Sequence, residues 1–190
     1  ATIQDESGKS SGLGAIAQAQ ARVGDMKWAL ETVTALRSEN SRAAVLRALA
    51  ESQAKKGDRA GATETFRLAL QTAAAIQDES KKANALWGIA ETQAKGGNRA
   101  AAVETFQLAL QAVATIEDEN AKSSALFQIA HAQARAGDGK GALQTAATIP
   151  SKAYKTLILP IIPQAQAAAG DLKGALETLT AMQIEHKPGI

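Results

Sequence analysis

The chain repeats itself, and this repetition limits the folds it can adopt more than any other feature of the sequence. Residues 51–70 read ESQAKKGDRAGATETFRLAL and residues 91–110 read ETQAKGGNRAAAVETFQLAL, so fourteen of twenty positions are identical. A glycine followed by Asp or Asn recurs five times, at spacings of 33, 40, 40 and 33 residues. These glycines are Gly24, Gly57, Gly97, Gly137 and Gly170. Such a period is typical of an array in which one small structural unit is copied along the chain.

Each of these glycines is predicted to lie in a turn between two helices. Glycine tolerates the left-handed backbone that ends many helices, and the Asp or Asn that follows can cap the next helix. Before the third turn, Leu86, Ile89, Ala90 and Gln93 recur at the i, i+3, i+4 and i+7 spacing of one helical face. The sequence therefore predicts an all-α fold built from helical hairpins.

Five such hairpins account for the chain, which is predicted to be a single array over residues 1–190. The units are expected at about residues 3–36, 37–76, 77–116, 117–149 and 150–185. The second and third units are seven residues longer than the others, which is about two helical turns. We therefore expect the second helix of each of these two units to be longer, with its apolar face still in register.

The third unit resembles the tetratricopeptide repeat (TPR), whose helices carry the patterns W-x2-L-G-x2-Y and A-x3-F-x2-A. Ala102, Phe106 and Ala109 match the second pattern, whereas Leu86 stands at the Trp position of the first. Glutamine replaces the Tyr in all five units, as Gln20, Gln53, Gln93, Gln133 and Gln166. The resemblance implies a right-handed α-solenoid of five antiparallel repeats, with Phe66 and Phe106 in its core. Stacked repeats bury apolar faces that one hairpin alone would expose.

Composition and motifs give no sign of catalysis. The chain has no cysteine, and its two histidines, His131 and His186, are 55 residues apart. The acidic residues at 78–79 and 117–119 precede predicted helices, where they complement the helix dipole. We therefore expect no catalytic, cofactor-binding or metal-binding residues, and we predict that the protein is not an enzyme. No run of 18 apolar residues exists, so no membrane span is predicted, and the absence of cysteine leaves the compartment open.

The TPR resemblance implies that the first helix of each unit lines a concave groove, and its off-core positions supply the candidate partner-binding residues. Trp87 and Phe127 occupy the same position in neighbouring units and are predicted as aromatic anchors, although both could instead be packing residues. A basic row at the helix ends could bind anions, or could simply complement the helix dipole. The full set is Trp87, Phe127, Arg47, Glu51, Glu91, His131, Arg22, Lys55, Lys95 and Arg135.

The function predicted from these features is a scaffold that binds a peptide or partner protein in the groove. The first alternative is a structural module that stacks end to end, and the second is an RNA-binding helical repeat. A net charge of only +2 and the acidic Glu51 and Glu91 disfavour nucleic acid.

Two features of the last unit leave alternatives open. Pro160 and Pro163 fall inside its first helix, which should either kink or start afresh at Pro160. The apolar run around them, residues 157–162, is either buried between units four and five or faces a partner. The last helix, from about 171 to 185, would leave its apolar positions Ala175, Leu176, Leu179 and Met182 without a covering helix. We therefore expect either a stretch of a longer array or a homo-oligomer formed through open ends.

Overall fold

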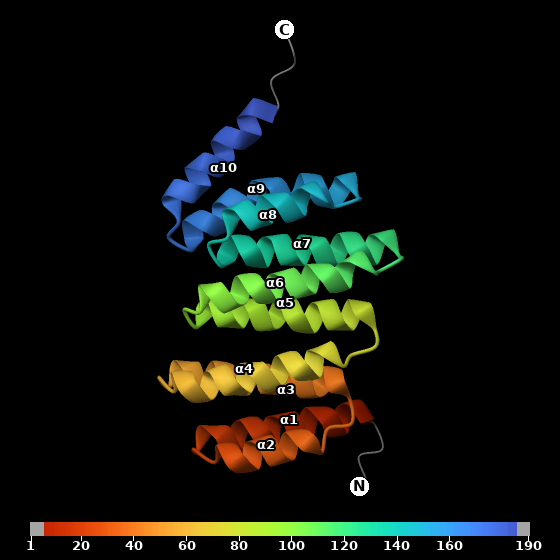
Figure 1. Ribbon diagram of the computed structural model, residues 1–190, viewed down its shortest axis with the longest axis vertical. Helices are drawn as coiled ribbons and strands as arrows, with labels where there is room; N and C mark the ends of the chain where they lie inside the picture. The colour runs from red at the N-terminus through yellow and green to blue at the C-terminus, as the bar shows by residue number, and fades with distance from the viewer. Residues whose placement is uncertain (1–5, 186–190) are drawn as a thin grey trace.

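The structure, a computed structural model, describes residues 6–185, and within this range it is all-α with no strand (Figure 1). Ten helices follow one another, separated by short turns. They are α1 (Glu6–Arg22), α2 (Met26–Thr34), α3 (Glu39–Lys55), α4 (Arg59–Ala74), α5 (Glu79–Lys95), α6 (Arg99–Ala114), α7 (Glu119–Arg135), α8 (Gly139–Ala147), α9 (Lys152–Ala168) and α10 (Leu172–Glu185). The all-α class and the number of helices agree with the sequence-based prediction.

Adjacent helices pack as pairs, α1 with α2 through α9 with α10. The odd-numbered helices also pack against one another in series, and α2, α4, α6 and α8 each pack against the odd-numbered helix that follows. In Figure 1 the pairs succeed one another along the longest axis, with α1 and α2 at one end and α10 at the other. The odd-numbered helices thus form a connected layer to which each even-numbered helix is added.

The five predicted turns are present, and their backbone follows the predicted chemistry. All five turn glycines have positive φ, between 81° and 96°. The Asp or Asn after each glycine caps the next helix: for example, Asp58 Oδ1 accepts a hydrogen bond from the Gly61 backbone N–H at 2.9 Å. The glycine is needed because a Cβ disfavours this left-handed region.

Adjacent Gly96 and Gly97 allow a controlled test of this backbone requirement. Gly97 has φ +85° and open space around a Cβ, whereas Gly96 has φ −77° and only ordinary contacts there. We expect Gly97→Ala to lower the free energy of unfolding by about 1–2 kcal/mol, because only the backbone is strained. Gly96→Ala should be neutral or stabilise by up to about 1 kcal/mol. Urea denaturation of both variants measures this, and equal effects would contradict the assignment of the turn.

The helix lengths reproduce the repeat spacing. Helices α4 and α6 have 16 residues each, whereas α2 and α8 have 9 residues each. The difference is the seven residues that separate a spacing of 40 from a spacing of 33. The predicted elongation of the second helix in units two and three is therefore confirmed.

The core is built from small and medium-sized apolar side chains. Phe106 is 1% exposed and Phe66 is 7% exposed, which confirms the prediction that both lie in the core. Fully buried Leu49, Ile89 and Ile129 lie at one shared position in α3, α5 and α7. Many of the remaining buried positions are alanines, which let neighbouring helices approach closely.

Helix α9 runs without a break through both of its prolines, so a fresh start at Pro160 does not occur. Pro163 is buried and Pro160 is exposed. The apolar run is divided between two environments, since Ile158 and Ile162 are fully buried while Leu157 is exposed. Packing against α7, α8 and α10 holds this helix together despite the two backbone N–H groups that proline removes.

Candidate binding surfaces

A small depression lies between α3 and α5, on the layer of odd-numbered helices. Its volume is about 260 Å³, and Arg47, Trp87 and Glu91 line it together with asparagine, alanine and glycine residues. Trp87 is half-buried against the core, and its indole Nε1–H donates a hydrogen bond to Asn84 Oδ1 at 3.0 Å. The sequence analysis placed these three candidates on the same surface, and the structure brings them around one depression.

Arg47 joins α3 to α5 at this depression. Its stem passes over Gly88, where an added Cβ would lie 3.6 Å from the Arg47 Cδ. Its Nη1–H donates to Thr92 Oγ1 at 3.2 Å. Gly88 therefore leaves room for the arginine to cross from one helix to the next beside Trp87.

A second depression of about 310 Å³ adjoins the first, because Glu91 lines both. Lys95, Arg99 and Arg135 surround it, with alanines of α5, α7 and α9 completing the wall. Glu91 Oε1 lies 3.1 Å from Lys95 Nζ and 3.1 Å from Arg135 Nη1, so one carboxylate pairs with cations from two helices. Three cations against one carboxylate make this depression electropositive.

The neighbouring titratable groups respond to the same charges. A hydrogen bond from Lys55 holds the pKa of Glu51 below its ordinary value, and the Lys55, Arg47 and Lys95 charges add to this. Burial lowers the pKa of His131, as does the nearby Arg135, while the Glu91 carboxylate opposes the change. Glu51, Glu91, His131 and the cations around them thus form one alternating strip of charge across α3, α5 and α7.

Three of the four residues in the predicted basic row are held by ion pairs. Lys55 Nζ lies 2.7 Å from Glu51 Oε1, one turn earlier on α3, and Lys95 and Arg135 share Glu91. Arg22 is exposed in the last turn of α1, outside both depressions. Exposed pairs of this kind contribute little to stability, so these cations remain accessible to a competing anion.

Phe127 lies in a different environment from Trp87, although the two occupy equivalent positions in the repeat. Its ring packs edge-on against Tyr154 of α9, with ring centroids 5.8 Å apart and planes 61° apart. Phe127 lines neither of the two depressions. The structure therefore places this aromatic residue between α7 and α9.

The glutamine of each unit forms a polar clasp within its helix pair, which the sequence analysis did not foresee. In every pair, a threonine hydroxyl donates to the Oε1 of the glutamine at 2.7–2.8 Å. The backbone N–H of the residue after the turn glycine also donates to the carbonyl of the same glutamine, at 2.9–3.0 Å. The threonines are Thr32, Thr65, Thr105, Thr145 and Thr178. Their spacings of 33, 40, 40 and 33 residues match the glycine spacings and could have revealed the pairing.

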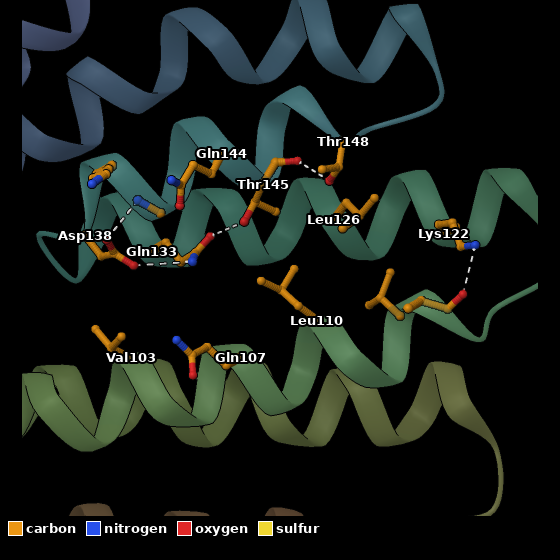
Figure 2. Close-up of a pocket in the computed structure, with 14 residues that line it drawn as sticks. Val103, Gln107, Leu110, Lys122, Leu126, Gln133, Asp138, Gln144, Thr145 and Thr148 are labelled. Atoms are coloured by element: carbon orange, nitrogen blue, oxygen red, sulfur yellow. Dashed lines mark hydrogen bonds between the residues drawn. The ribbon is translucent and has the colours of Figure 1, made fainter.

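The largest cavity lies elsewhere, between α6 and α8 over α7 (Figure 2). Its volume is about 690 Å³, and none of the ten predicted groove residues lines it. Figure 2 shows Val103, Gln107 and Leu110 of α6 facing Leu126 and Gln133 of α7 across the space. Leu110 belongs to the seven-residue extension that α6 has and α8 lacks. The drop in spacing from 40 to 33 was the available sequence signal for this cavity.

Other kinds of site find no support in residues 6–185. No group of three or more His, Asp or Glu side chains in this part of the chain is arranged to hold a metal ion. None of its helices combines the length and the apolar character that crossing a bilayer requires.

Comparison with known proteins gives a likeness of fold. No protein-family model matches the sequence, and no curated protein matches it significantly. The crystal structure of Ton1535 from Thermococcus onnurineus NA1 is similar, with a TM-score of 0.63 over 98% of this chain at 20% sequence identity. This chain spans 60% of the length of that protein. At this identity the likeness extends to the fold alone: a helical repeat-like, all-α arrangement.

Proposed function

We propose that the chain is a TPR-like, right-handed α-solenoid of five helical repeats, and that it binds a peptide or partner protein rather than catalysing a reaction. The A-x3-F-x2-A match of the third unit, the five glycine turns and the serial packing of the odd-numbered helices support this architecture. Ton1535 adds a solved fold that is similar over nearly the whole chain.

The observation that carries the binding proposal is the half-buried Trp87 beside Arg47 and Glu91, at a depression that continues into a cationic one. Trp and Arg are the residue types most enriched among energetically dominant interface positions. A depression of about 260 Å³ has room for one side chain of a partner, not for a folded domain. The binding mode we propose is thus an extended segment that crosses α3, α5 and α7.

The charges around the two depressions define the partner further. An apolar side chain of the segment fits beside Trp87, where alanines of α3 and α5 form the walls. An acidic side chain next to it fits the second depression, since Lys95, Arg99 and Arg135 outnumber Glu91 there. Such charge complementarity orients a bound segment and raises its association rate.

Peptides selected from a displayed random library against the wild-type chain provide the test. We expect Trp87→Ala to weaken the binding of selected peptides by about 2 kcal/mol, which is roughly 30-fold in Kd. Trp28→Ala is the matched control, because Trp28 is 59% exposed on α2, an even-numbered helix. Fluorescence anisotropy of labelled peptides measures both. Selected peptides that lose equal affinity with either variant, or with neither, would contradict the proposal.

A further inference from the structure

We propose that the two ends of the helix stack are complementary docking surfaces, through which copies of this chain associate head to tail. In this arrangement α9 and α10 of one copy pack against α1 of the next. The proposal does not depend on peptide binding at Trp87, because it concerns different helices.

The first observation is a break in the burial pattern at α1. Eight residues before each turn glycine stands a large aliphatic residue: Ile16, Leu49, Ile89, Ile129 or Ile162. The last four are 0% exposed, whereas Ile16 is 51% exposed. The residue type is retained in the first unit, but its cover is missing.

The missing cover can be identified from the helix contacts. Helices α3, α5 and α7 each touch four others: the preceding pair, their own partner and the next odd-numbered helix. Helix α1 touches its partner α2 and the next odd-numbered helix α3, and no preceding pair lies against it in residues 6–185. The exposure of Ile16 therefore marks the place where a preceding helix pair would pack.

The second observation is the converse break at α10. Nine residues after each turn glycine stand Val33, Phe66, Phe106, Ala146 and Leu179. The first four are at most 7% exposed, but Leu179 is 45% exposed. Helices α2, α4, α6 and α8 each pack against the next odd-numbered helix, and no such helix lies against α10 in the described part of the chain.

The exposed face of α10 is wider than this one residue. Leu172 and Leu176 are 65% and 66% exposed, and together with Leu179 they recur at i, i+4 and i+7. This spacing places all three leucines along one side of the helix. A helix that exposes such an apolar stripe gains free energy when a partner covers it.

The two ends supply what each other lacks. Helix α10 lacks an odd-numbered helix after it, and α1 is an odd-numbered helix whose buried-type Ile16 lacks a pair before it. The junction would repeat the packing of α8 on α9 or of α6 on α7 inside the chain. The occupant that fits both surfaces is a second copy of the same chain in the same repeat register.

This contact is heterologous, which means that it joins two different surfaces. It therefore generates open chains of copies and not closed dimers unless the rotation between copies brings the ends together. Figure 1 places α1 and α10 at opposite ends of the longest axis, so one copy has no means of joining its own two ends as a rigid body. We expect the average mass to rise continuously with protein concentration.

Two variants that each block one end give a decisive test. Ile16→Glu blocks the α1 end and Leu179→Glu blocks the α10 end, and each variant alone should remain monomeric at 19.6 kDa. Mixed in equal amounts, the two should form a dimer of twice that mass through the remaining intact ends. Leu108→Glu is the matched control, because Leu108 is 43% exposed on α6 and should leave wild-type association unchanged.

Multi-angle light scattering across a concentration series measures these masses, and circular dichroism checks that each variant is folded. Leu176→Glu replaces Leu179→Glu if the latter is unfolded, since Leu176 is more exposed. A wild-type chain that stays monomeric up to millimolar concentration would overturn the proposal. So would a single blocked variant that still associates, or a mixture of the two that remains monomeric.

Discussion

Replacing Phe106 by alanine is expected to lower the free energy of unfolding by about 3–5 kcal/mol, the range measured for deep aromatic truncations. Phe106 is 1% exposed, and its helix α6 packs against both α5 and α7. The lost ring removes contacts within one pair and to the next pair at the same time. Stability in a repeat array is approximately a sum of such unit and neighbour terms, so a defect here weakens two terms.

Leu108→Ala is the control for this change, because Leu108 lies two residues away on the same helix and is 43% exposed. We expect its effect to stay within about 0.5 kcal/mol. Urea unfolding followed by circular dichroism measures both variants. Similar losses for the two would mean that Phe106 does not occupy the core position assigned to it.

The second large effect is expected at the buried clasp of the third pair. Gln93 is 4% exposed and Thr105 is 2% exposed, and the Thr105 hydroxyl donates to Gln93 Oε1 at 2.8 Å. We expect Gln93→Ala to cost about 3 kcal/mol, because it leaves a buried hydroxyl without its acceptor and opens a void. Thr105→Val keeps the shape but removes the donor, and should cost about 1–3 kcal/mol.

A double-mutant cycle separates the hydrogen bond from the packing. If the clasp couples the two helices, the double variant should be more stable than the sum of the single losses predicts, by about 1 kcal/mol or more. Gln111→Ala, at an exposed position on α6, is the control and should be nearly neutral. Strictly additive losses would show that the glutamine and threonine act independently.

Much of the fold could be predicted because the sequence repeats its backbone requirements. A glycine at a left-handed position and an Asp or Asn cap are local signals, and both recur at each turn from Gly24 to Gly170. The extra seven residues of α4 and α6 could likewise be counted from the spacing. Such features depend on residues close together in the sequence, so one chain is sufficient to find them.

The rest depends on contacts between distant residues. Trp87 and Phe127 share a repeat position, but only the structure shows that Tyr154 packs against Phe127 while Trp87 stays beside an open depression. The continuity of α9 through Pro160 and Pro163 is also set by the helices packed around it.

The candidate surface was predicted in part. The row positions of Arg47, Trp87 and Glu91 could be assigned from the helical period, and the structure places the three together. The pairing of Glu91 with Arg135 across two units, and the cavity between α6 and α8, required the positions of neighbouring helices. The period of a helix defines its faces, but it does not say which residues of the next unit lie opposite.

The most direct test of the central claim is to map a bound peptide by amide and indole chemical shifts in the uniformly labelled wild-type chain. The proposal places the contact on the layer of odd-numbered helices. It predicts that a selected peptide shifts the Trp87 indole resonance and the backbone amides around Arg47, Gly88 and Glu91. Shifts confined instead to Val103, Leu110 and Gln144, which line the cavity between α6 and α8, would contradict it.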